Sequence, residues 1–163
     1  MFMRYWRLTG FVMVMLLAGC TGIKYSQNIT EQRVIQQVSV KIEYKGGGIY
    51  QLEVDTDLAD PIALQWNSSA YLNTSGGKIR LIHVENVSEI SESVPVEQEP
   101  SLIAQGAKFK TYFVGESWMD YARRGVTPQP KDSVKKAMIY LAFIIEGKRV
   151  YWKGEVSFHS NNE

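Results

Sequence analysis

Residues 38–54 read VSVKIEYKGGGIYQLEV, and this stretch decides the fold class. Apolar side chains alternate with polar ones from Val38 to Tyr44 and again from Tyr50 to Val54, which is the period of a strand with one buried face. The three glycines between the two runs favour a tight turn, because glycine adopts positive φ without steric cost. The stretch therefore predicts a β-hairpin.

Strand character returns along the rest of the chain. Residues 78–84 and 101–114 suit strands, and residues 137–145 form an apolar run typical of a central strand covered on both faces. A turn at 146–148 leads to an alternating strand that points Trp152 inward. Seven or eight short strands with little helical periodicity predict an all-β domain. We expect a single immunoglobulin-like β-sandwich, with a closed β-barrel as the alternative.

The composition is that of an ordinary globular domain, with 45% hydrophobic and 21% charged residues in 163. Removing Arg4 and Arg7 with the N-terminal segment leaves 16 basic and 17 acidic side chains. The chain therefore lacks the basic excess that binding to nucleic acid requires. Its one cysteine, Cys20, excludes an intrachain disulfide, so the domain must rest on its apolar core.

The N-terminal segment has the features of a secretory signal. Arg4 and Arg7 precede the apolar run 10–17, which is too short to span a hydrocarbon core of ~30 Å. The run ends in Leu17-Ala18-Gly19-Cys20, which resembles the lipobox of bacterial lipoprotein precursors residue for residue. An ordinary signal peptide with an incidental cysteine is the alternative.

The lipobox resemblance implies a diacylglycerol thioether on Cys20, cleavage after Gly19 and acylation of the new amino group. Two or three acyl chains would anchor the protein stably to a membrane. In this family an aspartate after the cysteine favours the inner membrane, whereas this sequence has Thr21. In a Gram-negative host, the resemblance therefore implies the periplasmic face of the outer membrane.

Three regions follow from these patterns. Residues 1–19 form the signal peptide, the polar residues 20–32 form a lipidated tether, and residues 33–160 form the β domain. A second resemblance concerns uncharacterised immunoglobulin-like bacterial lipoproteins. It implies a fold and no activity, and it rests on Trp66-Asn67-Ser68-Ser69, the turn Gly76-Gly77, Arg80, His83 and Ala104-Gln105-Gly106.

Residues suited to catalysis are sparse in the sequence. There are two histidines, His83 and His159, and no Gly-x-Ser-x-Gly motif. We therefore expect no enzymatic activity and no cofactor, with a hydrolase that uses His83 as the alternative. Three carboxylates after a strand could hold Ca²⁺ in a loop, but a solvated turn is the favoured interpretation of Asp55, Asp57 and Asp60.

The segment 115–132 has loose patterning and holds the best surface candidates for an interaction: Trp118, Tyr121, Arg123 and Arg124. Large aromatics and arginine are enriched at the centres of interfaces. A loop packed over the end of the sandwich is the alternative. We therefore expect a lipid-anchored, non-enzymatic binding or assembly component of a bacterial envelope complex, with another envelope protein as its partner. The alternative is a periplasmic lipoprotein that binds a small ligand or glycan.

Overall fold

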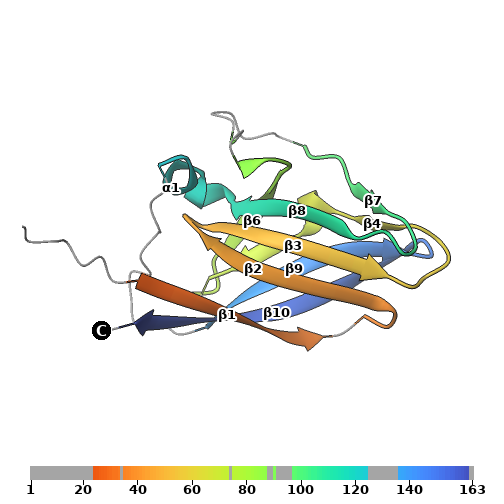
Figure 1. Ribbon diagram of the computed structural model, residues 1–163, viewed down its shortest axis with the longest axis horizontal. Helices are drawn as coiled ribbons and strands as arrows, with labels where there is room; N and C mark the ends of the chain where they lie inside the picture. Colours follow the sequence, from red (N-terminus) through yellow and green to blue (C-terminus); the bar gives the residue numbers. More distant parts are fainter. Residues whose placement is uncertain are drawn as a thin grey trace, which may run out of the picture.

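The computed structural model describes residues 24–33, 35–73, 75–87, 90, 97–124 and 136–161. Ten strands form one continuous antiparallel sheet (Figure 1). The strands are β1 Lys24–Arg33, β2 Val38–Gly46, β3 Ile49–Thr56, β4 Ile62–Leu64, β5 Ala70–Leu72, β6 Lys78–Val84, β7 Ser101–Ile103, β8 Phe109–Gly115, β9 Lys136–Ile145 and β10 Lys148–Asn161. The all-β prediction is confirmed.

The sheet folds over into two layers, and β6 belongs to both of them. Its first residues, Lys78–Arg80, pair with β5, while Leu81–Val84 pair with β8. One layer contains β1, β10, β9 and β5, and the other contains β8, β3 and β2. The two strands at the ends of this order, β1 and β2, lie in contact with each other. The domain is therefore a two-layered sheet that nearly closes into a barrel.

The hairpin predicted over residues 38–54 is present as β2 and β3. Val40 faces Val54 and Tyr44 faces Tyr50 across the pair. Along β2 the more buried side chains alternate with exposed ones, as the sequence predicted. The strand number is higher than the predicted seven or eight, because β4, β5 and β7 contain three residues each and are too short to show a period.

The prediction of a tether over residues 20–32 is wrong from Lys24 onward. β1 begins at Lys24 and pairs with β10 along its length, with Ile29 opposite Val156. Glu31 accepts a hydrogen bond from the indole of Trp152, and Ile29 packs against the core. The polar composition misled the sequence prediction, because backbone pairing at an edge strand needs few apolar side chains.

Large aromatic residues fill the space between the layers. Trp66, Trp152, Tyr50, Phe113 and Phe143 are the largest fully buried side chains in the described residues. The inward direction predicted for Trp152 is thus confirmed. Its indole lies over Gly154, where an added Cβ would overlap the ring, so any other residue at this position of β10 would force the indole to shift.

The end of β8 leads into the short helical segment of the domain. The 3₁₀ turn η3 (Glu116–Trp118) continues into the five-residue helix α1 (Met119–Arg123). Met119 and Ala122 are buried and anchor α1 on the sheet. A second 3₁₀ turn, η1 (Trp66–Ser68), separates β4 from β5, and both of these strands pair with β9.

Candidate ligand-binding pocket between β7 and β8

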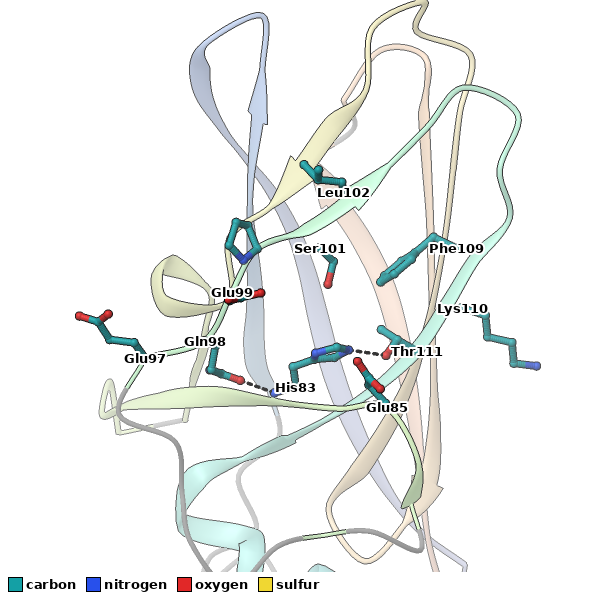
Figure 2. Close-up of a pocket in the computed structure, with 11 residues that line it drawn as sticks. His83, Glu85, Glu97, Gln98, Glu99, Ser101, Leu102, Phe109, Lys110 and Thr111 are labelled. Atoms are coloured by element: carbon teal, nitrogen blue, oxygen red, sulfur yellow. Dashed lines mark hydrogen bonds between the residues drawn. The ribbon is translucent and has the colours of Figure 1, made fainter.

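β7 and β8 follow each other in the chain but diverge instead of pairing. Among the described residues, β7 pairs with β4 alone, and Phe109–Thr111 of β8 pair with β3 alone, because β6 joins β8 only from Tyr112 onward. A pocket of about 660 Å³ opens between the two strands (Figure 2). This volume lies within the usual ~300–1,000 Å³ of ligand sites. The lining residues are His83, Glu85, Glu97, Gln98, Glu99, Pro100, Ser101, Leu102, Phe109, Lys110 and Thr111.

His83 forms the floor of the pocket, and β6 positions it there. Its ring stacks on the fully buried indole of Trp66, with centroids 4.7 Å apart and planes 9° from parallel. Its Nε2 is 2.7 Å from the hydroxyl of Thr111 on β8 (Figure 2). Burial lowers the pKa of His83, and the negative charge of Glu85 only partly opposes this effect. The structure therefore favours a neutral imidazole.

Trp66 connects the pocket floor to its wall. The indole Nε1 donates a hydrogen bond of 2.9 Å to the hydroxyl of Ser101 at the start of β7. Three residues on, the buried Ser69 hydroxyl accepts from the backbone N–H of Ala142 and donates to the carbonyl of Gln65. The segment Trp66–Ser69 thus joins β9, β6 and β7, and the polar groups of Trp66 and Ser69 are used for structure.

Gln98 holds in place the loop 97–100, which forms one side of the pocket. Its side-chain amide accepts a 2.6 Å hydrogen bond from the N–H of His83 and donates one of 2.8 Å to the carbonyl of Leu81, so it replaces a neighbouring strand at the free edge of β6. The backbone of Gln98 in turn exchanges two hydrogen bonds with the side-chain amide of Asn67. No periodic signal in the sequence marked Asn67 or Gln98 for this role.

The mouth of the pocket combines apolar surface with negative charge. Leu102 is 74% exposed, the highest value among the large apolar residues with described side chains, and Phe109 lies half-buried opposite it. Three carboxylates, Glu85, Glu97 and Glu99, lie on the lining. The one lining cation, Lys110, is 3.5 Å from Glu53 on β3, and Figure 2 shows its side chain directed away from the pocket. The pocket therefore suits a ligand with apolar and basic groups.

The predicted interaction residues gather around α1, at the other end of β8 from the pocket. Trp118 is half-buried, because its indole packs edge-on against Tyr71 and covers Gly48 and Gly115. The ring centroids of Trp118 and Tyr71 are 4.5 Å apart. It serves the packing of the domain end, which was the alternative interpretation of this segment. Burial raises the pKa of Tyr71 far above its usual value.

Tyr121 and the two arginines differ from Trp118 in exposure. Tyr121 is 39% exposed, and the guanidinium of Arg124 lies over its ring at 5.7 Å. Arg123 forms a 2.8 Å ion pair with Asp120. These three residues of the predicted set are the ones that present functional groups at the surface.

The other sequence predictions have different outcomes. Asp55, Asp57 and Asp60 are exposed, and the described residues contain no group of three side chains able to hold a metal ion. The loop after β3 is instead organised by Thr56, whose hydroxyl accepts from the N–H of Leu58. Gly19 and Cys20 lie outside the described residues.

Comparison of the chain with protein-family models, curated proteins and solved structures gives no match. In the part of the chain that the structure describes, no helix is long and apolar enough to cross a membrane.

Proposed function

We propose that the protein is a lipid-anchored component of the bacterial envelope whose β domain binds another envelope protein without catalysing a reaction. The observation that carries the proposal is the lipobox Leu17-Ala18-Gly19-Cys20, followed within four residues by the first strand of a folded domain. This order of signal, cysteine and domain is what a lipoprotein needs to hold a binding surface at a membrane.

The pocket supports binding over catalysis. The imidazole of His83 is stacked on Trp66 and hydrogen-bonded to Thr111, and the hydroxyl of Ser101 accepts from Trp66. The groups that a hydrolase would use are thus engaged in holding the fold. The exposed Leu102 lies beside edges of β7 and β8 that have no strand partner among the described residues, and an apolar contact next to such an edge is what protein partners use.

Anchoring is tested by metabolic labelling of the full-length chain with radioactive palmitate. We expect label on the wild type and none on Cys20→Ser, because the thioether needs the thiol. Wild-type protein that stays unlabelled in a host that labels its own lipoproteins would contradict the proposal. In a Gram-negative host, Thr21→Asp should move the labelled protein from the outer-membrane fraction to the inner one.

Partner binding is tested by a photo-crosslinking amino acid at Leu102 in intact cells. We expect a discrete adduct with one envelope protein, identified by mass spectrometry. The matched position is Lys148, which is also exposed but lies at the start of β10, beside the β9–β10 turn. Equal adducts from both positions, or none from Leu102, would count against the pocket as the binding surface.

A small ligand or glycan is the second candidate, and the pocket volume favours it. The indole of Trp66 lies beneath His83, so a ligand in the pocket should change its fluorescence. Titration with cell-wall fragments and sugars tests this function, with Trp66→Phe as the control that should lose the response. An unchanged spectrum across the panel would remove this candidate.

A further inference from the structure

The distance between the lipid and the folded domain is short, and this restricts how the domain lies on the membrane. The inference rests on the proposed anchoring at Cys20. Only Thr21, Gly22 and Ile23 separate Cys20 from Lys24, where β1 begins. Four peptide steps span at most about 14 Å, even when fully extended. The end of the domain that holds Lys24 must therefore stay close to the headgroups.

The strand register identifies the elements at this end. Lys24 pairs with Asn161 at the end of β10, and Leu72 at the end of β5 pairs with Met138 near the start of β9. The β2–β3 turn and the η3–α1 segment lie at the same end, on the left of Figure 1. We call it the α1 end. The opposite end holds the β9–β10 turn and the loops after β3 and β7.

The α1 end carries more basic than acidic side chains. By strand register and position along the chain, the charged residues with described side chains at this end are Lys45, Lys78, Arg80, Arg123, Arg124 and Lys153, against Glu31, Glu43, Glu116, Asp120 and Glu155. Lys78 and Arg124 are exposed. The pocket, near the other end of β8, is lined by Glu85, Glu97 and Glu99 with Lys110. The charge distribution thus directs the α1 end toward a negative surface and the pocket away from it.

Tyr121 adds an aromatic contact to these charges. Its ring is exposed on α1, and the guanidinium of Arg124 lies over it. Tyrosine is enriched where a protein meets the headgroup layer, because its ring is apolar and its hydroxyl is polar. Basic side chains beside it attract anionic lipid headgroups.

We infer that the α1 end is a membrane-docking surface, in which Tyr121, Arg124 and Lys78 contact the headgroups of anionic phospholipids while the lipid on Cys20 holds the domain in place. Docking of this end leaves the pocket between β7 and β8 facing away from the bilayer. A partner can then reach Leu102 without displacing the domain from the membrane.

The test uses the mature lipidated protein in vesicles, with an environment-sensitive dye on one introduced cysteine. The thiol of Cys20 is blocked by its lipid, so only the introduced cysteine reacts. Ser117→Cys places the dye beside α1, and Leu102→Cys places it at the pocket mouth; both positions are exposed. In vesicles with phosphatidylglycerol, we expect protection from the neutral quencher acrylamide at position 117 and full quenching at position 102.

Charge removal measures the electrostatic part of docking. Each basic side chain near an anionic surface contributes about fivefold to the ratio of docked to undocked domain, so Lys78→Gln with Arg124→Gln should lower it about 25-fold. The matched control is Lys148→Gln with Arg149→Gln, two exposed cations at the opposite end. The control and the conservative pair Lys78→Arg with Arg124→Lys should keep the dye protected.

The outcomes separate the anchor from the docking surface. Mass spectrometry of the purified protein first establishes whether Cys20 carries lipid, and its absence would overturn the anchoring. If the lipid is present and the dye at position 117 is quenched as fully as that at position 102, the docking inference is wrong. Protection that is equal in phosphatidylcholine vesicles, or unchanged in the Lys78→Gln, Arg124→Gln protein, would also overturn the role of charge.

Discussion

Two pairs of consecutive strands in this domain differ in whether the two strands pair with each other. β9 and β10 turn at Glu146–Gly147 and pair from Ile145↔Lys148 to Lys136↔Ser157. β7 and β8 are joined by only five residues, 104–108, and do not pair with each other. The difference arises because β7 joins β4 in one layer whereas β8 joins β3 in the other. The paired strands β9 and β10 contribute to the stable core, whereas β7 and β8 leave a pocket between two edges that have no strand partner in the part of the chain that the structure describes.

The largest effect should come from the paired hairpin. Trp152→Ala removes a fully buried indole from β10 and its hydrogen bond to Glu31. We expect a loss of about 3–5 kcal/mol in the free energy of unfolding, measured by urea denaturation. Arg149→Ala, an exposed position on the same strand, is the control and should change it by less than about 0.5 kcal/mol. Similar values for both variants would show that β10 is not central to the core.

Gly154 should show the next largest effect. A Cβ at this position would overlap the Trp152 ring, so Gly154→Ala forces the indole to shift and should cost about 1–3 kcal/mol. The double variant Gly154→Ala, Trp152→Leu tests the cause. If the ring is the obstacle, the alanine should cost less in the leucine background; strictly additive losses would contradict this explanation.

In the loop before β7, Gln98→Ala should destabilise the domain by about 1 kcal/mol. The N–H of His83 and the carbonyl of Leu81, both on β6, lose their hydrogen-bond partner in this variant. The sharper readout is hydrogen exchange. The amide of His83 should exchange faster in the variant, whereas Glu99→Ala, at the adjacent exposed position, should leave it protected. A His83 amide that stays protected in Gln98→Ala would mean that another group covers the edge of β6.

His83, which lines the pocket between β7 and β8, should make the unfolding free energy of the domain depend on pH. Its pKa is lowered by burial, so the unfolded chain takes up a proton at a higher pH than the folded one. Stability linked to this group is therefore complete above pH 6.5 and decreases as the pH falls below it. Between pH 7.5 and pH 5.5, the wild type should lose more unfolding free energy than His83→Gln does. Equal losses would show that His83 titrates normally.

The two strand pairs also show what the sequence could predict. The β2–β3 and β9–β10 hairpins were predictable because the two strands of each hairpin are consecutive in the sequence. Their alternating or apolar runs are also long enough to indicate strands. β1 was mistaken for a tether, because its polar sequence gives no strand period. The strand forms by pairing with β10, more than 120 residues away in the sequence.

The candidate pocket was not predictable from local patterns. It depends on Trp66 stacking on His83 and on the amide of Gln98 reaching β6, contacts that no period or motif encodes. His83 was recognised as a strand residue, but its neighbours were not. The cluster of Tyr121, Arg123 and Arg124 was found from composition, because aromatic and basic residues in a loosely patterned segment are a local signal.

The smallest expected effect on stability is the most informative about function. Leu102 is 74% exposed on β7, so Leu102→Asp removes almost no buried area and should change the unfolding free energy by less than about 0.5 kcal/mol. The same change adds a fourth carboxylate to the acidic pocket mouth and removes its apolar contact. A photo-crosslinker at the neighbouring lining position Pro100 should then lose its partner adduct. A large loss of stability would instead mean that Leu102 is buried in solution, whereas an unchanged adduct would place the binding surface elsewhere on the domain.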